Sequence, residues 1–135
     1  MTRVYIDMVA DLFHVGHLNI IKKAKSLGDI LLVGIHSDKD VQSYKRLPII
    51  NHADRVSLIE SCKYVDLVIP NAPLIITKDF INKHQISLVV HGDDTGSVPI
   101  EQHLAPRELG IMKYLPYTSG VSTSDIITKI QTRQV

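Results

Sequence analysis

Short aliphatic runs alternate with helix-like segments along the whole chain, and this alternation constrains the fold more than any other feature of the sequence. The aliphatic runs cover residues 4–9, 29–36, 65–69, 87–91 and 111–115. Strands this apolar must be covered on both faces, as in a parallel sheet with helices on either side. The sequence therefore predicts an α/β fold with a doubly wound parallel sheet in three αβα layers.

Helical patterns separate these runs. They cover residues 15–27, 51–62 and 77–84, a less regular stretch at 100–109 whose length Pro106 limits, and a last helix that begins at Ser122. Ser122 and Asp125 have the spacing of a capping box at this last helix start. The polar segments 37–50 and 92–99 are expected to be loops.

Size and composition favour a single soluble domain over residues 1–135. The chain has no apolar run that could span a bilayer and no secretory signal, which predicts a cytoplasmic protein without a transmembrane segment. Fifteen basic residues face fourteen acidic ones, so the overall charge does not suggest a nucleic acid partner. The single cysteine, Cys62, is expected to be a small buried hydrophobe.

The fold class predicts where a ligand binds. In doubly wound sheets, ligands lie beyond the carboxyl ends of the strands. The loops after Ile6, Ile35, Val90 and Leu115 should therefore form the site.

The first of these loops contains His14 and His17 at the start of a helix, with Gly16 between them. Their spacing sets both rings on one helix face, while Gly16 allows a ligand to approach the backbone and the helix start favours an anion. This pattern favours phosphate binding. Two alternatives remain: a metal site completed by His36 or His91, or a pair of incidental surface histidines.

Three motifs in the same order resemble the cytidylyltransferase family. They are Asp11 to His17, the Lys63-Tyr64-Val65-Asp66 segment with Asn71-Ala72-Pro73 after it, and the run from Thr118 to Ile127. The resemblance covers most of the chain and implies a Rossmann-like fold. It implies transfer of CMP from CTP to a small phosphorylated alcohol (phosphoethanolamine, phosphocholine or glycerol 3-phosphate), with release of pyrophosphate. A homodimer is also expected, with Mg²⁺ held mainly by the triphosphate and no metal ligand from the chain.

The resemblance also implies residue roles. Catalytic roles fall to His14, His17, Lys45, Ser122 and Thr123. Nucleotide-binding roles fall to Val9, Ala10, Asp11, Gly16, Lys63, Gly92, Asp94, Tyr117 and Thr118, and Arg55 would contact the acceptor or the triphosphate.

Simpler interpretations exist for several of these residues. Lys45 could belong to a solvated loop, Arg55 could form a surface ion pair with Asp54 or Glu60, and Ser122 and Thr123 could only cap their helix. Gly92 to Asp94 could be an ordinary turn.

The chain also departs from the family pattern. Lys63 and Tyr117 stand where the family has arginines, and Met8-Val9-Ala10 replaces the usual Gly-Thr-Phe. These changes leave open a phosphonate acceptor such as 2-hydroxyethylphosphonate, an adenylyltransferase, or a nucleotide-binding module without catalysis. The proposed transfer of CMP requires that His14 and His17 share one cavity with Ser122 and Thr123.

Overall fold

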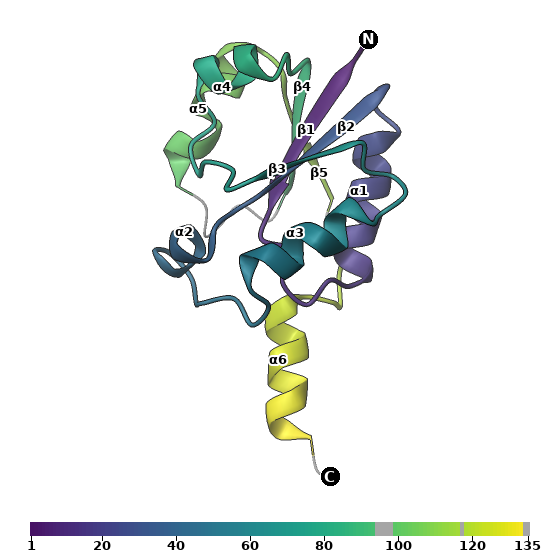
Figure 1. Cartoon of the computed structure of the whole chain (residues 1–135), viewed down its shortest axis with the longest axis vertical. Helices are drawn as coiled ribbons and strands as arrows, with labels where there is room; N and C mark the ends of the chain where they lie inside the picture. The colour runs from purple at the N-terminus through teal and green to yellow at the C-terminus, as the bar shows by residue number, and fades with distance from the viewer. Residues whose placement is uncertain (94–98, 117, 134–135) are drawn as a thin grey trace.

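The five strands form one parallel sheet in the order β3-β2-β1-β4-β5 in the computed structural model, which describes residues 1–93, 99–116 and 118–133 (Figure 1). The strands are β1 (Arg3–Met8), β2 (Ile30–Ile35), β3 (Leu67–Pro70), β4 (Leu88–Gly92) and β5 (Met112–Leu115). β1 lies at the centre, where Val4 pairs with Leu31 on one side and with Leu88 on the other. The predicted doubly wound α/β fold is confirmed.

The described part of the chain also contains six α-helices and one 3₁₀ turn. They are α1 (Val15–Lys25), α2 (Asp38–Gln42), α3 (His52–Glu60), α4 (Lys78–Lys83), η1 (Ile100–His103), α5 (Leu104–Glu108) and α6 (Thr123–Thr132). None of them is long and apolar enough to cross a membrane.

The two faces of the sheet bury separate apolar clusters, because successive strand residues point to opposite faces. On one face, Val4 and Ile6 of β1 pack with Ile21 of α1 and Ile59 of α3. On the other face, Tyr5 belongs to the cluster packed below α4 and α5. Figure 1 shows these two helix pairs on opposite sides of the sheet. The half-buried Cys62 packs against the first cluster, in agreement with its expected apolar role.

Two elements differ from the expectation. The segment 37–50 begins with the short helix α2, because the Ser37 hydroxyl accepts a hydrogen bond from Asp40 N and Val41 is buried beneath the helix. The stretch 100–109 is divided into η1 and α5. Pro106 is accommodated within the first turn of α5, where backbone N–H groups have no helical acceptor.

The last helix, α6, projects away from the body of the molecule (Figure 1). None of its described residues is buried. Its start is nevertheless fixed, because Ser122 Oγ accepts a hydrogen bond from Asp125 N at 3.0 Å. Only the first turn of α6 therefore belongs to the packed part of the structure.

Gly34 is required for the close packing of β2 against Tyr5. A Cβ at position 34 would overlap the Tyr5 hydroxyl oxygen and would lie 2.7 Å from Ala72 Cβ. The Tyr5 side chain is fully buried and its hydroxyl has no hydrogen-bond partner. The sheet can therefore relieve this crowding only by moving the Tyr5 ring or the segment that carries Ala72.

We expect Gly34→Ala to lower the free energy of unfolding by about 1–3 kcal/mol, since it overpacks a dense core. Urea unfolding followed by circular dichroism measures this change. Tyr5→Phe is the matched control, and alone it should change stability by less than about 1 kcal/mol because the lost hydroxyl is unpaired. The double variant should recover part of the loss, and strictly additive effects would contradict the proposed overlap.

Candidate active site

A cavity of about 450 Å³ opens at the carboxyl ends of the strands, as the fold class predicts. A pocket of this size suits a small organic ligand. Most of the predicted site residues line it: Val9, Ala10, Asp11, His14, Gly16, His17, Lys45, Gly92, Thr118, Ser122 and Thr123. The structure thus brings together residues that lie more than one hundred positions apart in the sequence.

His14 and His17 cap the start of α1 reciprocally. His14 Nδ1 accepts a hydrogen bond from Gly16 N at 3.0 Å, and His17 Nδ1 accepts one from His14 N at 3.1 Å. A backbone N–H can only donate, so each Nδ1 must carry a lone pair. In the neutral rings, the proton therefore resides on Nε2. Each ring is left with one N–H donor that the cap does not use.

Both histidines are held in the neutral form. Burial, with a smaller contribution from the adjacent His14, lowers the pKa of His17 from 6.5 to about 4. Burial also lowers the pKa of His14. The two ring centroids are only 3.9 Å apart, so protonation of one ring disfavours protonation of the other. At neutral pH the pair consists of uncharged donors.

The start of α6 joins the histidine loop directly. Thr123 Oγ1 donates a hydrogen bond to Asp11 O at 2.8 Å and lies 3.4 Å from His14 Nε2. A second hydrogen bond links α1 to the segment before α6, because Asn19 Nδ2 donates to Thr118 Oγ1 at 3.0 Å. The first turns of α1 and α6 therefore border the same cavity, and helix N-termini favour anions.

Positive charge reaches the cavity from the loop after α2. Both Lys45 and Arg46 line the cavity, and Arg46 Nη1 donates a hydrogen bond to Ser124 Oγ at 3.2 Å. Lys45 is close enough to His17 that its charge contributes to the low pKa of that ring. Arg46 is a cavity residue that the sequence motifs do not single out. Its position next to Lys45 in a basic loop was the available signal.

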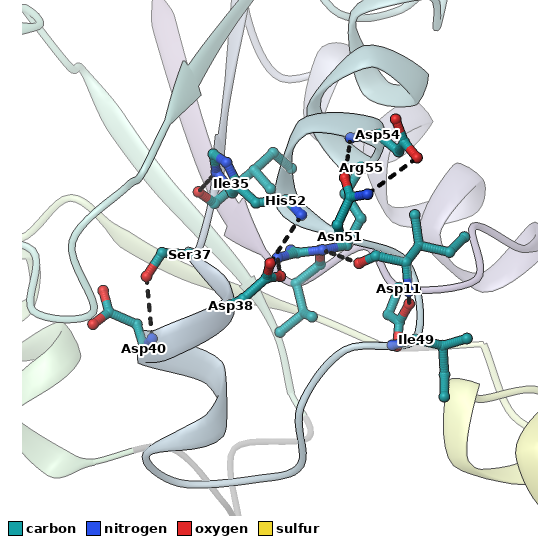
Figure 2. Close-up of polar contacts among 12 residues, drawn as sticks. Asp11, Ile35, Ser37, Asp38, Asp40, Ile49, Asn51, His52, Asp54 and Arg55 are labelled. Carbon is teal, nitrogen blue, oxygen red and sulfur yellow. Dashed lines mark hydrogen bonds and ion pairs between the residues drawn. The ribbon is translucent and has the colours of Figure 1, made fainter.

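Arg55 is fully buried and does not line the cavity; Figure 2 shows it beside Asp38. Its fully buried guanidinium donates hydrogen bonds to Val9 O at 2.6 Å, to Ile50 O at 2.9 Å and to Asp38 Oδ1 at 2.6 Å. The ion pair forms with Asp38, whereas the sequence had suggested Asp54 or Glu60 as surface partners. The structure therefore does not bring Arg55 into the cavity.

Asp11 also has a structural task within the site. Its buried carboxylate accepts hydrogen bonds from Ile49 N at 2.8 Å and from Ile50 N at 2.9 Å (Figure 2). These bonds tie the loop after β1 to the segment that carries Lys45 and Arg46. The Asp11 carboxylate thus positions the cavity wall.

Of the other predicted nucleotide contacts, Lys63 does not line the cavity. Lys63 is exposed, and its Nζ lies over the Tyr64 ring, 5.3 Å from the centroid. Asp94 and Tyr117 lie outside the described residues.

The floor of the cavity contains a buried polar group that the sequence analysis missed. Asp7 Oδ2 accepts hydrogen bonds from Gln102 Nε2 at 2.8 Å and from His36 Nε2 at 3.2 Å. Although burial opposes ionisation, the contact with His36 lowers the pKa of Asp7 and raises that of His36. His36 Nδ1 also contacts Ala72 O at 3.1 Å, which fits a doubly protonated ring. The only advance signal was an aspartate inside an aliphatic strand.

Comparisons with known proteins agree with the motifs. The ethanolamine-phosphate cytidylyltransferase of Dictyostelium discoideum is 42% identical over 133 residues, which are 94% of this chain and 37% of that protein. The choline-phosphate cytidylyltransferase A of Homo sapiens is 38% identical over 134 residues, which are 95% of this chain and 36% of that protein. The chain therefore spans little more than a third of these relatives.

Solved structures with the same fold include a lipopolysaccharide core biosynthesis protein from Thermoplasma volcanium GSS1. It has a TM-score of 0.71 and 27% identity, with 87% of this chain and 97% of that chain covered. A pantoate-beta-alanine ligase from Francisella tularensis shares the fold at a TM-score of 0.57 and 14% identity, with 96% of this chain and 69% of that chain covered.

The family comparison covers nearly the whole site. The model of the family described as cytidylyltransferase-like matches residues 8–129, which include the histidine loop, the loop with Lys45 and the start of α6. The resemblance inferred from the three motifs is confirmed. The chain belongs to the cytidylyltransferase-like family.

Proposed function

We propose that this chain transfers CMP from CTP to a small phosphorylated alcohol, such as phosphoethanolamine, phosphocholine or glycerol 3-phosphate. The observation that carries the proposal is the shared cavity of His14, His17, Ser122 and Thr123. The family supports the nucleotide, and relatives named for ethanolamine phosphate and choline phosphate support the acceptor class.

The proposed reaction is an in-line displacement at the α-phosphorus of CTP. An acceptor phosphate oxygen forms the new bond to this phosphorus while the bond to the α–β bridging oxygen breaks. Pyrophosphate leaves with the electron pair, and no covalent bond to the enzyme forms. The protein must therefore orient two anions and stabilise the charge that moves onto the phosphate oxygens.

His14 and His17 are suited to that stabilisation. Their Nδ1 atoms are committed to the α1 cap, so each neutral ring offers an Nε2–H donor whose direction the cap determines. Such preorganised donors need no reorientation during the reaction. We assign Ser122 and Thr123 to the β- and γ-phosphates at the start of α6, and Lys45 to the charge of the leaving pyrophosphate.

The nucleotide would contact the loop after β1 and the end of β4. Ala10 has a positive φ of 57°, which turns the chain sharply beside the cavity. We assign Val9, Ala10, Gly16, Gly92 and Thr118 to the nucleotide because all of them line the cavity. We assign Asp11 and Arg55 to the positioning of this loop, because their polar groups are engaged within the protein.

We propose that Mg²⁺ enters with the triphosphate. Within the described residues, no cluster of carboxylates lies near His14 and His17, and both Asp11 oxygens accept backbone hydrogen bonds. Mg²⁺ prefers oxygen ligands and is commonly held by substrate phosphates. Its role would be to reduce the charge on the triphosphate. A homodimer completes the proposal on the strength of the family resemblance.

A turnover screen tests this function. Incubation of the chain with CTP, Mg²⁺ and phosphoethanolamine, phosphocholine, glycerol 3-phosphate or 2-hydroxyethylphosphonate should release pyrophosphate with at least one acceptor. The same acceptors with ATP should give much slower release. Equal or faster turnover with ATP would instead identify an adenylyltransferase. Failure of every acceptor with CTP would favour a nucleotide-binding module without catalysis.

His14→Asn separates the two roles of the histidine. The Asn side-chain oxygen can replace Nδ1 as the helix cap, so we expect stability within about 1 kcal/mol of the wild type. The variant lacks the Nε2–H donor and should lose a factor of about 10²–10³ in kcat. Pyrophosphate release and urea unfolding measure the two effects. Unchanged kcat with an intact fold would argue against a catalytic role for His14.

The pKa of His17 predicts an acid-sensitive fold. Its folded value is about 4 against an ordinary value of 6.5, so between these pH values the unfolded chain binds the additional proton more readily. This contribution to stability is complete above pH 6.5 and declines as the pH falls toward 4. Wild-type Tm should therefore fall more steeply than that of His17→Asn across this range. Parallel Tm curves would contradict the buried neutral histidine.

A further inference from the structure

Three side chains of types that bind metal ions converge below the cavity. Asp7, His91 and His103 each offer one ligand atom, and these atoms all lie within 4.8 Å of one another. No other group of three or more such residues occurs in the part of the chain that the structure describes. Asp7 and His103 are 3% and 1% exposed, so water does not readily satisfy them.

Two atoms of this group are buried without any hydrogen-bond partner. They are Asp7 Oδ1 and His103 Nε2. Leaving a buried carboxylate oxygen and a ring nitrogen unsatisfied is costly, and charged groups are the most costly. Either a cation lies between these atoms or the structure bears an unusual local penalty.

The surrounding contacts orient Asp7 for such a cation. Oδ2 is occupied by Gln102 Nε2 at 2.8 Å and by His36 Nε2 at 3.2 Å. Oδ1 is directed toward His91, whose Nε2 is 4.0 Å away and too distant for a hydrogen bond. The Asp7 carboxylate is therefore held in place through Oδ2, while Oδ1 remains available to bind a cation.

The two histidines are also held by their outer nitrogens. His91 Nδ1 lies 2.9 Å from Gly92 O, which can only accept, so this nitrogen carries the proton and Nε2 of the neutral ring carries a lone pair. His103 Nδ1 lies 3.2 Å from Tyr114 Oη, which leaves Nε2 directed toward the group. Histidines that bind metals are typically oriented in this way by a hydrogen bond at the second nitrogen.

We propose that Asp7, His91 and His103 bind one divalent transition-metal ion of the Zn²⁺ type. Two imidazoles and one carboxylate with a fourth open position are a common ligand set for zinc. Tetrahedral ligands about 2 Å from the ion are separated by about 3.3 Å, so modest side-chain rotations would close the site. Imidazole ligands disfavour Mg²⁺, so this site is distinct from the Mg²⁺ proposed for the triphosphate.

The site would also be accessible to a ligand in the cavity. Asp7 and His91 line the cavity, whereas His103 lies behind them. The fourth coordination position would therefore face the cavity and hold water or a polar oxygen of the acceptor. Only this last assignment rests on the proposed transferase function, because metal binding itself can be measured without turnover.

Zinc binding by the full chain tests the site. After treatment with a chelator and removal of the chelator, calorimetric titration with Zn²⁺ should show one ion per chain, and millimolar Mg²⁺ should not displace it. His91→Gln, His103→Gln and the nearly isosteric Asp7→Asn should each weaken binding by more than about tenfold. Circular dichroism of each metal-free variant checks that it has folded. Zn²⁺ should also raise the Tm of the wild type and not that of these variants.

Two histidine variants serve as matched controls. His84→Gln removes a ring that packs on Phe80 far from the group, and His17→Asn removes half of the other histidine pair. Both should bind Zn²⁺ like the wild type. Absence of stoichiometric binding by the wild type would overturn the proposal, as would binding that survives the ligand variants but is lost in His17→Asn. Zinc binding without pyrophosphate release would support the metal site and would contradict only the proposed transferase function.

Discussion

The loop after β1 is held from several directions, and the candidate active site depends on this restraint. Arg55 reaches it from α3 through Val9 O, while Thr123 reaches it from the start of α6 through Asp11 O. The Asp11 carboxylate then binds the backbone of Ile49 and Ile50. A buried guanidinium is stable only when its donors are satisfied, so the loop and Arg55 stabilise each other. The histidines that follow are thereby directed into the cavity.

In the candidate active site, the hydrogen-bond donors and the positive charges come from different residues. Reciprocal capping and burial keep His14 and His17 neutral, so they offer directional donors and little net charge. The positive charge comes from Lys45 and Arg46 on a separate loop. A neutral donor avoids the desolvation cost of a buried cation. The loop that carries Lys45 and Arg46 would contact the triphosphate of the proposed CTP nearer to solvent, where the desolvation cost of a charge is lower.

The sequence predicted the features that follow from chain periodicity. Alternating aliphatic runs imply a parallel sheet, and parallel strands place successive loops at one edge, which is why His14 and Thr123 could be expected in one cavity. Burial of Arg55 could not be predicted, because an arginine in a helix is usually exposed and its acceptors, Val9 O and Ile50 O, are backbone atoms brought near only by folding. The floor around Asp7 was missed because its partners come from separate segments without a local motif.

The charge around Asp7 at the floor of the cavity would influence which of the proposed acceptors can bind there. Without a metal, the negative Asp7 is balanced by a protonated His36, so the floor is close to neutral. A divalent ion bound to Asp7, His91 and His103 would make the floor strongly positive. Coulomb repulsion in a poorly solvated pocket would then oppose the ammonium groups of phosphocholine and phosphoethanolamine, and would favour glycerol 3-phosphate or 2-hydroxyethylphosphonate among the proposed acceptors. If the proposed metal is bound, the metal content of the chain should therefore determine its preference among the proposed acceptors.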